Sequence, residues 1–196
     1  MHPYLTKLGV PPAVQDFFEP YYTTDEIGNM IFWYGDEAEH FGFAFHRVPV
    51  KGLWQAGNAN TAMIRQVFYC DNAMEAISFL SLNSSAYPYF DRLLFLAGEM
   101  ECCLPPQKSY SLVFNRDILG RIRDLKVAAA IRRLPVSVSL TGELVQIRFR
   151  QEKYTIPQDR FSLNTFEKIS KYRFNIKTYK SKNTDCWLDQ LKTTNF

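Results

Sequence analysis

Acidic and amide side chains follow two of the expected strands, at the point where each strand ends. Asp71 comes directly after the apolar run Gln66–Cys70, and Asn115 and Asp117 come shortly after the run Leu112–Phe114. Carboxylate and amide oxygens from different loops are ligands that Mg²⁺ accepts, and a bound Mg²⁺ can orient and neutralise a phosphoryl group during its transfer. The sequence therefore indicates a candidate metal site at Asp71, Asn115 and Asp117, with Asp71 as the candidate catalytic group.

Each of these residues also has a purely structural interpretation. Asp71 is placed to cap the helix expected at Ala73–Leu82, and Asp117 with Gly120 is typical of a turn between a strand and a helix. Glu75, one turn into the first of these helices, suits the helix dipole or an arginine partner better than a metal ion. The sequence leaves both interpretations open.

Basic residues are concentrated in the second half of the chain. Residues 1–98 carry a net charge of −5 and residues 99–196 a net charge of +8, which gives +3 for the whole chain. The stretch Arg121–Lys182 holds fifteen basic and five acidic side chains, interleaved with aromatic residues. This pattern suits phosphate contacts and base stacking, which indicates DNA or RNA as a partner, although a solvated basic face beside core rings has the same composition. The candidate contacts are Arg121, Arg123, Arg132, Arg133, Arg148 and Arg150.

The first part of the chain is expected to form a short helix and a small antiparallel sheet. The helix is predicted at Ala13–Phe18, because two prolines precede it and suit a helix start. Ala56–Thr61 is the most linker-like stretch, so we expect a small lobe over residues 1–58 and the main domain over residues 59–196. The strands of the lobe are expected at the apolar and aromatic runs Asn29–Tyr34, Phe41–Val48 and Leu53–Gln55.

Strands and helices alternate in the second part, which predicts an α/β fold with a mainly parallel sheet flanked by helices. The strands before Asp71 and Asp117 should be parallel and adjacent, or one strand apart, so that both acids lie at one edge of the sheet. Trp187 is expected to be buried. The expected strands are Gln66–Cys70, Arg92–Ala97, Leu112–Phe114, Val136–Leu140 and Leu144–Phe149, and the expected helices are Ala73–Leu82, Leu119–Leu134, Asn164–Lys171 and Trp187–Leu191.

The segments around these acids resemble the Toprim domain of bacterial-type primases, topoisomerases and related nucleases, and most of all the Toprim-like group encoded by mobile genetic elements. In that family the first strand ends in a glutamate, where this chain has Asp71, and the next helix carries an aspartate, where it has Glu75. The second strand ends in a glycine, which Leu93–Gly98 matches. The third strand ends in Asp-x-Asp-x-x-Gly-Arg, which Asn115–Arg121 resembles. Two further likenesses are the segment Asp185–Leu191, similar to a C-terminal motif of the mobile-element proteins, and residues 1–58, which resemble the lobe that precedes Toprim in primases.

Two acidic positions of the Toprim pattern are altered. Asp71 is one methylene shorter than glutamate, and Asn115 offers a carbonyl oxygen without a charge, so the resemblance implies a degraded site with weak or no Mg²⁺ binding. We therefore expect a non-catalytic Toprim-like module that binds nucleic acid or a DNA replication or mobilisation protein. Two alternatives remain, an active Mg²⁺-dependent phosphotransfer enzyme of the primase or nuclease type and a pure protein-interaction domain.

Composition excludes several other classes. The hydrophobic fraction of 46% and the charged fraction of 22% are those of a globular protein rather than a disordered one. No apolar run approaches the roughly 20 residues of a membrane helix, and the first ten residues lack a secretory signal. The four cysteines form no CxxC pair and only three histidines occur, so zinc and triad chemistry have little support. We expect a cytoplasmic, bacterial-type protein without a membrane partner.

Overall fold

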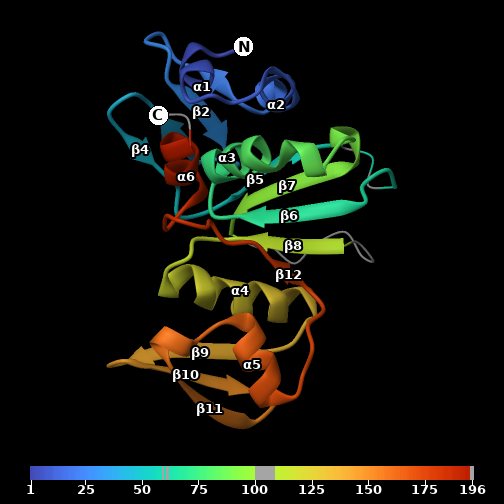
Figure 1. The fold of residues 1–196 in the computed structure, drawn as a ribbon, viewed down its shortest axis with the longest axis vertical. Helices are drawn as coiled ribbons and strands as arrows, with labels where there is room; N and C mark the ends of the chain where they lie inside the picture. The colour runs from blue at the N-terminus through green and yellow to red at the C-terminus, as the bar shows by residue number, and fades with distance from the viewer. Residues whose placement is uncertain (59, 61, 100–108, 195–196) are drawn as a thin grey trace.

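The computed structural model describes residues 1–58, 60, 62–99 and 109–194. Its first part contains two short helices and a four-stranded antiparallel sheet with the strand order β1-β2-β3-β4 (Figure 1). The run Phe41–Val48, expected as one strand, is instead divided between β3 and β4, because the Gly42 N–H donates to the Phe45 carbonyl and turns the chain back. The elements are α1 (Pro3–Lys7), α2 (Pro12–Phe18), β1 (Thr23–Thr24), β2 (Met30–Trp33), β3 (Ala38–Phe41) and β4 (His46–Arg47).

A five-stranded mixed sheet forms the centre of the molecule, with the strand order β12-β8-β6-β7-β5. The first four of these strands run parallel, and β5 runs antiparallel to β7. β6 and β8 are direct parallel neighbours, with Cys70 opposite Val113, so the expectation that Asp71 and Asp117 follow strands ending at one edge is confirmed. We call this edge, where β6, β7 and β8 end, the carboxyl edge. The strands are β5 (Leu53–Gly57), β6 (Gln66–Cys70), β7 (Leu93–Gly98), β8 (Ser109–Val113) and β12 (Lys177–Thr178).

The place of β5 corrects two expectations. Leu53–Gln55 does not belong to the antiparallel sheet of the lobe but pairs with β7, where Leu53 lies opposite Gly98. Ala56 and Gly57, expected in a linker, continue this strand. Trp54 and Ala56 are buried in the core, and this burial holds the strand on the central sheet. The expected boundary after residue 58 therefore falls directly behind a strand of the central sheet.

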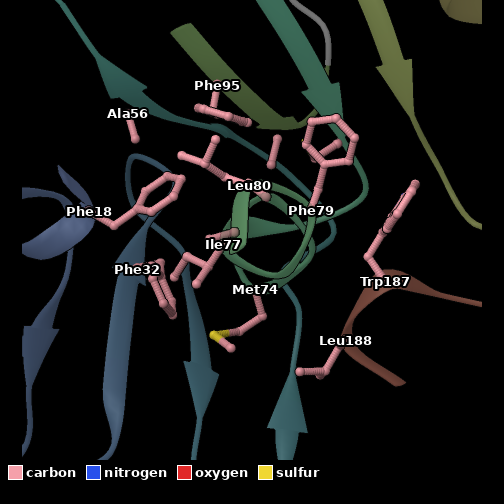
Figure 2. Packing of buried hydrophobic residues seen from close by; sticks show 14 of the residues in the cluster. Phe18, Phe32, Ala56, Met74, Ile77, Phe79, Leu80, Phe95, Trp187 and Leu188 are labelled. Atoms are coloured by element: carbon pink, nitrogen blue, oxygen red, sulfur yellow. The ribbon is translucent and has the colours of Figure 1, made fainter. Parts of the chain in front are cut away.

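Helices cover both faces of the central sheet, as the alternation of elements predicts. α3 (Ala73–Asn83) and α6 (Trp187–Thr194) lie on one face, and α4 (Ile118–Ile131) lies on the other (Figure 1). On the α3 side, residues of this helix pack between the N-terminal part and α6 (Figure 2). Trp187 is buried there against Phe79, with ring centroids 5.1 Å apart, which confirms the expected docking of the C-terminal helix.

On the α4 side the core is closed by a separate three-stranded antiparallel sheet with the order β11-β10-β9. Alternate residues of β10, Val145, Ile147 and Phe149, are buried, and the residues between them are exposed. The hairpin of β9 and β10 was expected, whereas β11 was not, because only one of its residues, Ile156, is fully buried and its polar composition hides the strand. The elements are β9 (Val136–Thr141), β10 (Leu144–Phe149), β11 (Glu152–Pro157) and α5 (Leu163–Ser170), and short 3₁₀ turns occur at η1 (Glu19–Tyr21), η2 (Ser84–Ala86), η3 (Phe90–Arg92) and η4 (Gln158–Arg160).

Among the described residues, Cys70 and Cys186 are free thiols, while Cys102 and Cys103 lie outside the described residues. Burial raises the pKa of the Cys70 thiol, which disfavours the reactive thiolate. In the part of the chain that the structure describes, no helix combines the length and the apolar character needed to span a membrane.

Candidate functional site

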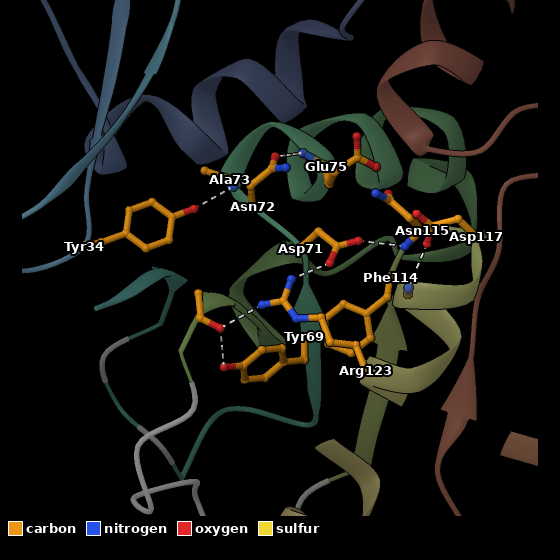
Figure 3. Close-up of polar contacts among 12 residues, drawn as sticks. Tyr34, Tyr69, Asp71, Asn72, Ala73, Glu75, Phe114, Asn115, Asp117 and Arg123 are labelled. Atoms are coloured by element: carbon orange, nitrogen blue, oxygen red, sulfur yellow. Dashed lines mark hydrogen bonds and ion pairs between the residues drawn. The ribbon is translucent and has the colours of Figure 1, made fainter. Parts of the chain in front are cut away.

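Asp71 lies at the centre of the carboxyl edge, and both of its carboxylate oxygens have partners (Figure 3). Oδ2 accepts a hydrogen bond from the backbone N–H of Asn115 at 2.7 Å, and Oδ1 forms an ion pair with Arg123. Burial raises the pKa of Asp71, and the adjacent guanidinium opposes this rise. The carboxylate that the sequence offers as a catalytic group therefore joins two parts of the chain.

Arg123, expected to contact nucleic acid, is the side chain that neutralises Asp71. It extends from α4 to the carboxyl edge, donates to the Gly98 carbonyl at 3.1 Å and lies over the Phe114 ring, 5.0 Å from the ring centroid. One guanidinium thus links the ends of β6, β7 and β8. A positive charge in this position occupies the place at the Asp71 carboxylate that a cation would need.

Asp117 and Gly120 have the structural role that the sequence left open. Asp117 is the N-cap of α4, and its Oδ1 accepts the Gly120 N–H at 2.7 Å. A Cβ atom on Gly120 would lie 2.1 Å from the Asn115 carbonyl oxygen, so only glycine permits this approach. The Asn115-x-Asp117-x-x-Gly120 spacing is therefore a strand-to-helix connection with its own local bonding.

Asn115 contributes its backbone rather than its side chain to the contact with Asp71. Its side-chain Oδ1 is buried and has no hydrogen-bond partner among the described residues. Within the same residues, no group of three or more histidine, cysteine, aspartate or glutamate side chains is arranged to hold a metal ion. The structure brings Asp71 and Asn115 into contact, but it directs Asp117 to the first turn of α4.

The cap of α3 comes from Asn72 and not from Asp71, for which the sequence left this role open. The N-cap of α3 is Asn72, whose Oδ1 accepts the Glu75 N–H at 2.9 Å, because the Asp71 side chain is turned towards Asn115 and Arg123. Glu75 lies in the first turn of α3, where its charge suits the helix dipole as expected, and no arginine pairs with it among the described residues. Its buried carboxylate accepts the backbone N–H groups of Trp187 at 2.7 Å and Leu188 at 3.2 Å, and so caps α6. Burial raises the pKa of Glu75 to about 7.

A fully buried glutamate from the N-terminal part, Glu39, was not found by sequence analysis. Its Oε2 accepts the Tyr34 hydroxyl at 2.6 Å and the Ala73 N–H at 2.8 Å. Its Oε1 accepts the Met74 N–H at 3.2 Å and lies 2.8 Å from His46 Nε2. Glu39 in β3 thus caps α3, as Glu75 in α3 caps α6. The available signal was its alternation with Phe41, which places a carboxylate on the buried face of a strand.

A second internal ion pair lies beneath the carboxyl edge. The Lys180 ammonium is 2.7 Å from Asp124 Oδ2 and donates to the carbonyl groups of Phe114 at 3.2 Å and Asn115 at 3.0 Å. Burial raises the pKa of Asp124 to about 7, although the charge of Lys180 opposes this. The C-terminal segment therefore holds the same loop that receives Asp71.

Two hollows flank these contacts. The larger, about 490 Å³, lies between the β3–β4 turn, the start of α3 and α6, and its polar lining includes Glu75, Asn115 and Lys192. The smaller, about 300 Å³, exposes one side of the Asp71–Arg123 pair beside Val50. These hollows can accept a loop or a small polar molecule. Cys186 and His46 both line the larger one, but His46 is bonded to Glu39, and burial raises the pKa of the Cys186 thiol, which disfavours the reactive thiolate.

The other predicted arginines do not all lie on one surface. Arg121 donates to the carbonyl groups of Arg116 at 3.0 Å and Phe161 at 3.2 Å, and Arg132 donates to the Phe174 carbonyl at 2.7 Å. These two lie at opposite ends of α4, about 16 Å apart along its axis. Arg133, Arg148 and Arg150 are exposed. Arg148 lies on the outer face of β10, whereas Arg133 and Arg150 lie in turns.

Comparisons of this chain with protein-family models, with curated proteins and with solved structures found no match.

Proposed function

We propose that the protein is a non-catalytic, Toprim-like module that binds nucleic acid or a DNA replication or mobilisation protein. The observation that carries the proposal is the ion pair between Asp71 and Arg123, at the point where a Toprim enzyme would need a free acidic group. The acids of the carboxyl edge stabilise the fold, and the excess positive charge lies elsewhere.

The residues expected to hold Mg²⁺ do not fit that ion. Asp71 offers a carboxylate whose two oxygens are already bonded, Asp117 caps a helix, and Asn115 has no charge. A metal ion would have to displace the Arg123 guanidinium and leave it without its acidic partner. This supports a binding function over the alternative of an active phosphotransfer enzyme.

The basic residues support nucleic acid as the partner. Of the fifteen basic side chains in Arg121–Lys182, four form ion pairs, namely Arg123, Arg160, Arg173 and Lys180. The other eleven have no carboxylate within 4.0 Å among the described residues. Unpaired surface charges of one sign favour a polyanion, and the affinity is driven by release of counterions.

Fluorescence anisotropy with labelled single-stranded and double-stranded DNA and RNA tests this proposal directly. We expect sequence-independent binding that weakens steeply with salt. Addition of Mg²⁺ or Mn²⁺ should produce neither cleavage nor primer synthesis. Absence of binding at low salt would remove the proposal, and metal-dependent cleavage that Asp117→Ala abolishes would replace it with the enzyme function.

A protein-interaction domain is the second candidate, and exposed apolar residues near the β3–β4 turn favour it. Phe43, in the β3–β4 turn, is 79% exposed and lines the larger hollow, and Val50, shortly after β4, is 86% exposed and lines the smaller one. The same titration separates the two functions. An interaction domain would leave the anisotropy of every oligonucleotide unchanged.

A further inference from the structure

The residues with unusual backbone conformation gather in one part of the molecule. Five non-glycine residues have a positive φ among the described residues, and all of them lie between positions 133 and 175. Asparagine tolerates this left-handed region, but arginine, glutamine and lysine rarely adopt it. Such conformations persist where the surrounding structure imposes them, and they often mark functional positions. The five residues are Arg133, Arg150, Gln151, Lys171 and Asn175.

Four of these residues stand at turn positions where glycine or asparagine is usual. Arg133 follows α4 in a Schellman motif, in which the Arg133 and Leu134 N–H groups donate to the Ala130 and Ala129 carbonyls. Arg150 and Gln151 form the two-residue turn between β10 and β11, with φ values of 51° and 69°. That turn normally carries Asn-Gly. Lys171 ends α5 with a φ of 54°. Three basic side chains therefore occupy positions that local conformation would assign to smaller residues.

These turns lie side by side in the fold. Phe149 is opposite Val136 and Glu152, so the β10–β11 turn lies at the same end of the small sheet as the connection from α4. The Arg150 guanidinium lies over the Tyr172 ring, 4.7 Å from its centroid, and the Tyr172 and Phe174 rings are 4.9 Å apart.

Arg132 completes this surface by donating to the Phe174 carbonyl. We call the five basic residues that these neighbouring segments carry the basic turn cluster; they are Arg132, Arg133, Arg150, Lys171 and Arg173.

Two arginines of this cluster are held in place by neighbouring groups, but most of its basic side chains have no acidic partner among the described residues. Arg132 is held by carbonyl groups and Arg150 by an aromatic ring, and neither contact removes a positive charge. Arg173 alone has an acidic partner, Glu167, at 3.1 Å. The nearby Glu152 is hydrogen-bonded to the Tyr154 hydroxyl. Arginines that are fixed before binding lose less conformational entropy when they contact an anion.

We propose that the basic turn cluster is the surface through which the protein contacts the phosphodiester backbone of a nucleic acid. The proposal rests on the proposed function and adds its location and chemistry. Guanidinium and ammonium groups at the tips of adjacent turns can bind successive phosphates without reading bases, which gives contact independent of sequence. Arg121 and Arg148, which lie elsewhere, are outside this contact.

Substitution towards the residues that the turns normally contain tests the cluster. The variant combines Arg133→Gly, Lys171→Gly, Arg150→Asn and Gln151→Gly, which removes three charges and relieves the backbone strain. The matched control, Lys7→Gln, Arg47→Gln and Lys51→Gln, removes three charges from exposed residues of the N-terminal part. The probe is a labelled DNA of about 30 nucleotides, single-stranded or in a duplex, titrated over a range of salt concentrations.

We expect the turn variant to melt at or above the temperature of the wild type and to bind DNA at least about tenfold more weakly at low salt. Its plot of log affinity against log salt should lose about two to three units of slope, because three phosphate contacts are lost. The control variant should keep the slope of the wild type. Charge-retaining changes, Arg133→Lys with Lys171→Arg, should also keep it.

Several results would overturn the assignment. If the wild type binds DNA and the turn variant binds equally well, the cluster is not the contact and the proposed function survives. If the wild type binds no nucleic acid, the proposed function fails with it. A lower melting temperature of the turn variant would show that the positive φ values of these residues do not strain the folded backbone. Equal affinity of the wild type for labelled poly-glutamate would assign the surface to an acidic protein.

Discussion

Charged side chains at the carboxyl edge of the central sheet are matched within the molecule, whereas those of the basic turn cluster mostly are not. At the carboxyl edge, Asp71 pairs with Arg123, and Asp124 beneath it pairs with Lys180. In the cluster, Arg132 and Arg150 are held by a carbonyl group and a ring and keep their charge.

This difference separates the charges that hold the fold together from the charges that can bind a partner. A buried charge must be paired inside the protein, because removing its counter-charge is costly. An exposed charge needs no such partner and stays available to a ligand. The acids that looked catalytic in the sequence therefore hold the fold together, and the cluster combines available charge with an unfavourable backbone. Changes at the carboxyl edge should reduce stability, and changes in the cluster should reduce binding.

The largest effect is expected for Glu39→Ala. This change removes the acceptor of two backbone N–H groups at the start of α3, of the Tyr34 hydroxyl and of the His46 contact. Leaving such groups unpaired should cost about 3–5 kcal/mol of unfolding free energy in urea titrations. Glu26→Ala, at an exposed position, is the control and should change stability by less than about 0.5 kcal/mol. A small effect of Glu39→Ala would show that the cap does not hold α3.

Breaking the central ion pair should have the next largest effect. Asp71→Ala leaves Arg123 unpaired and should cost about 2–4 kcal/mol, less than a fully buried pair, because the Arg123 side chain is 38% exposed. Asp71→Asn combined with Arg123→Met keeps an acceptor for the Asn115 N–H and should recover stability to within about 1 kcal/mol of the wild type. DNA affinity of the folded double variant should not change. Loss of DNA binding in that variant would move the contact to the carboxyl edge.

The pH dependence of stability tests the same difference between buried and exposed charges. Burial raises the pKa values of Glu75 and Asp124 to about 7 in the folded state. Between about pH 4 and pH 7 the folded state then binds more protons than the unfolded state, so the unfolding free energy falls as the pH rises. A loss of roughly 3 kcal/mol for each of the two carboxyl groups is expected over this window.

Urea titrations at several pH values measure that slope. Glu75→Gln and Asp124→Asn should each flatten it, whatever their effect on absolute stability. Lys168→Gln, a change of an exposed charge, should leave the slope unchanged. A slope that neither acid affects would contradict the role of these two carboxyl groups.

The smallest effect on stability is expected for Arg133→Gly alone. Glycine adopts the left-handed conformation without strain, so the unfolding free energy should stay the same or rise by up to about 1 kcal/mol. Thermal melting measures this change. A clear loss of stability would mean that the Arg133 side chain packs as part of the fold, and the contrast between the two regions would weaken.

Local patterns in the sequence were sufficient to predict most of the helices and strands. The alternation of buried residues in β10 and the apolar run of β6 identified both strands, and Trp187 was correctly expected in the core. β5 was misplaced because its alternation fits either sheet, and only its pairing with β7 decides between them.

The position of the candidate site was predictable, but the bonding partners of its side chains were not. Strand ends, turns and polar residues placed Asp71 and Asn115 at one edge of the sheet. The partners of Asp71 and Glu75 could not be predicted, because Arg123 is 52 residues away and Trp187 is 112 residues away in the sequence. Hydrogen bonding at such separations depends on how α4 and α6 dock, for which no local pattern exists.

Local patterns alone were enough to predict an α/β chain with a mainly parallel sheet, acids at its carboxyl edge and a basic second half. Hydrophobic periodicity and charge composition are local properties, so they can be read without coordinates. Two features were seen only in the folded molecule: which charges neutralise one another, and which turns hold basic residues in a left-handed conformation. Both depend on contacts between distant segments, because the energy of a charge is set by the groups that surround it after folding.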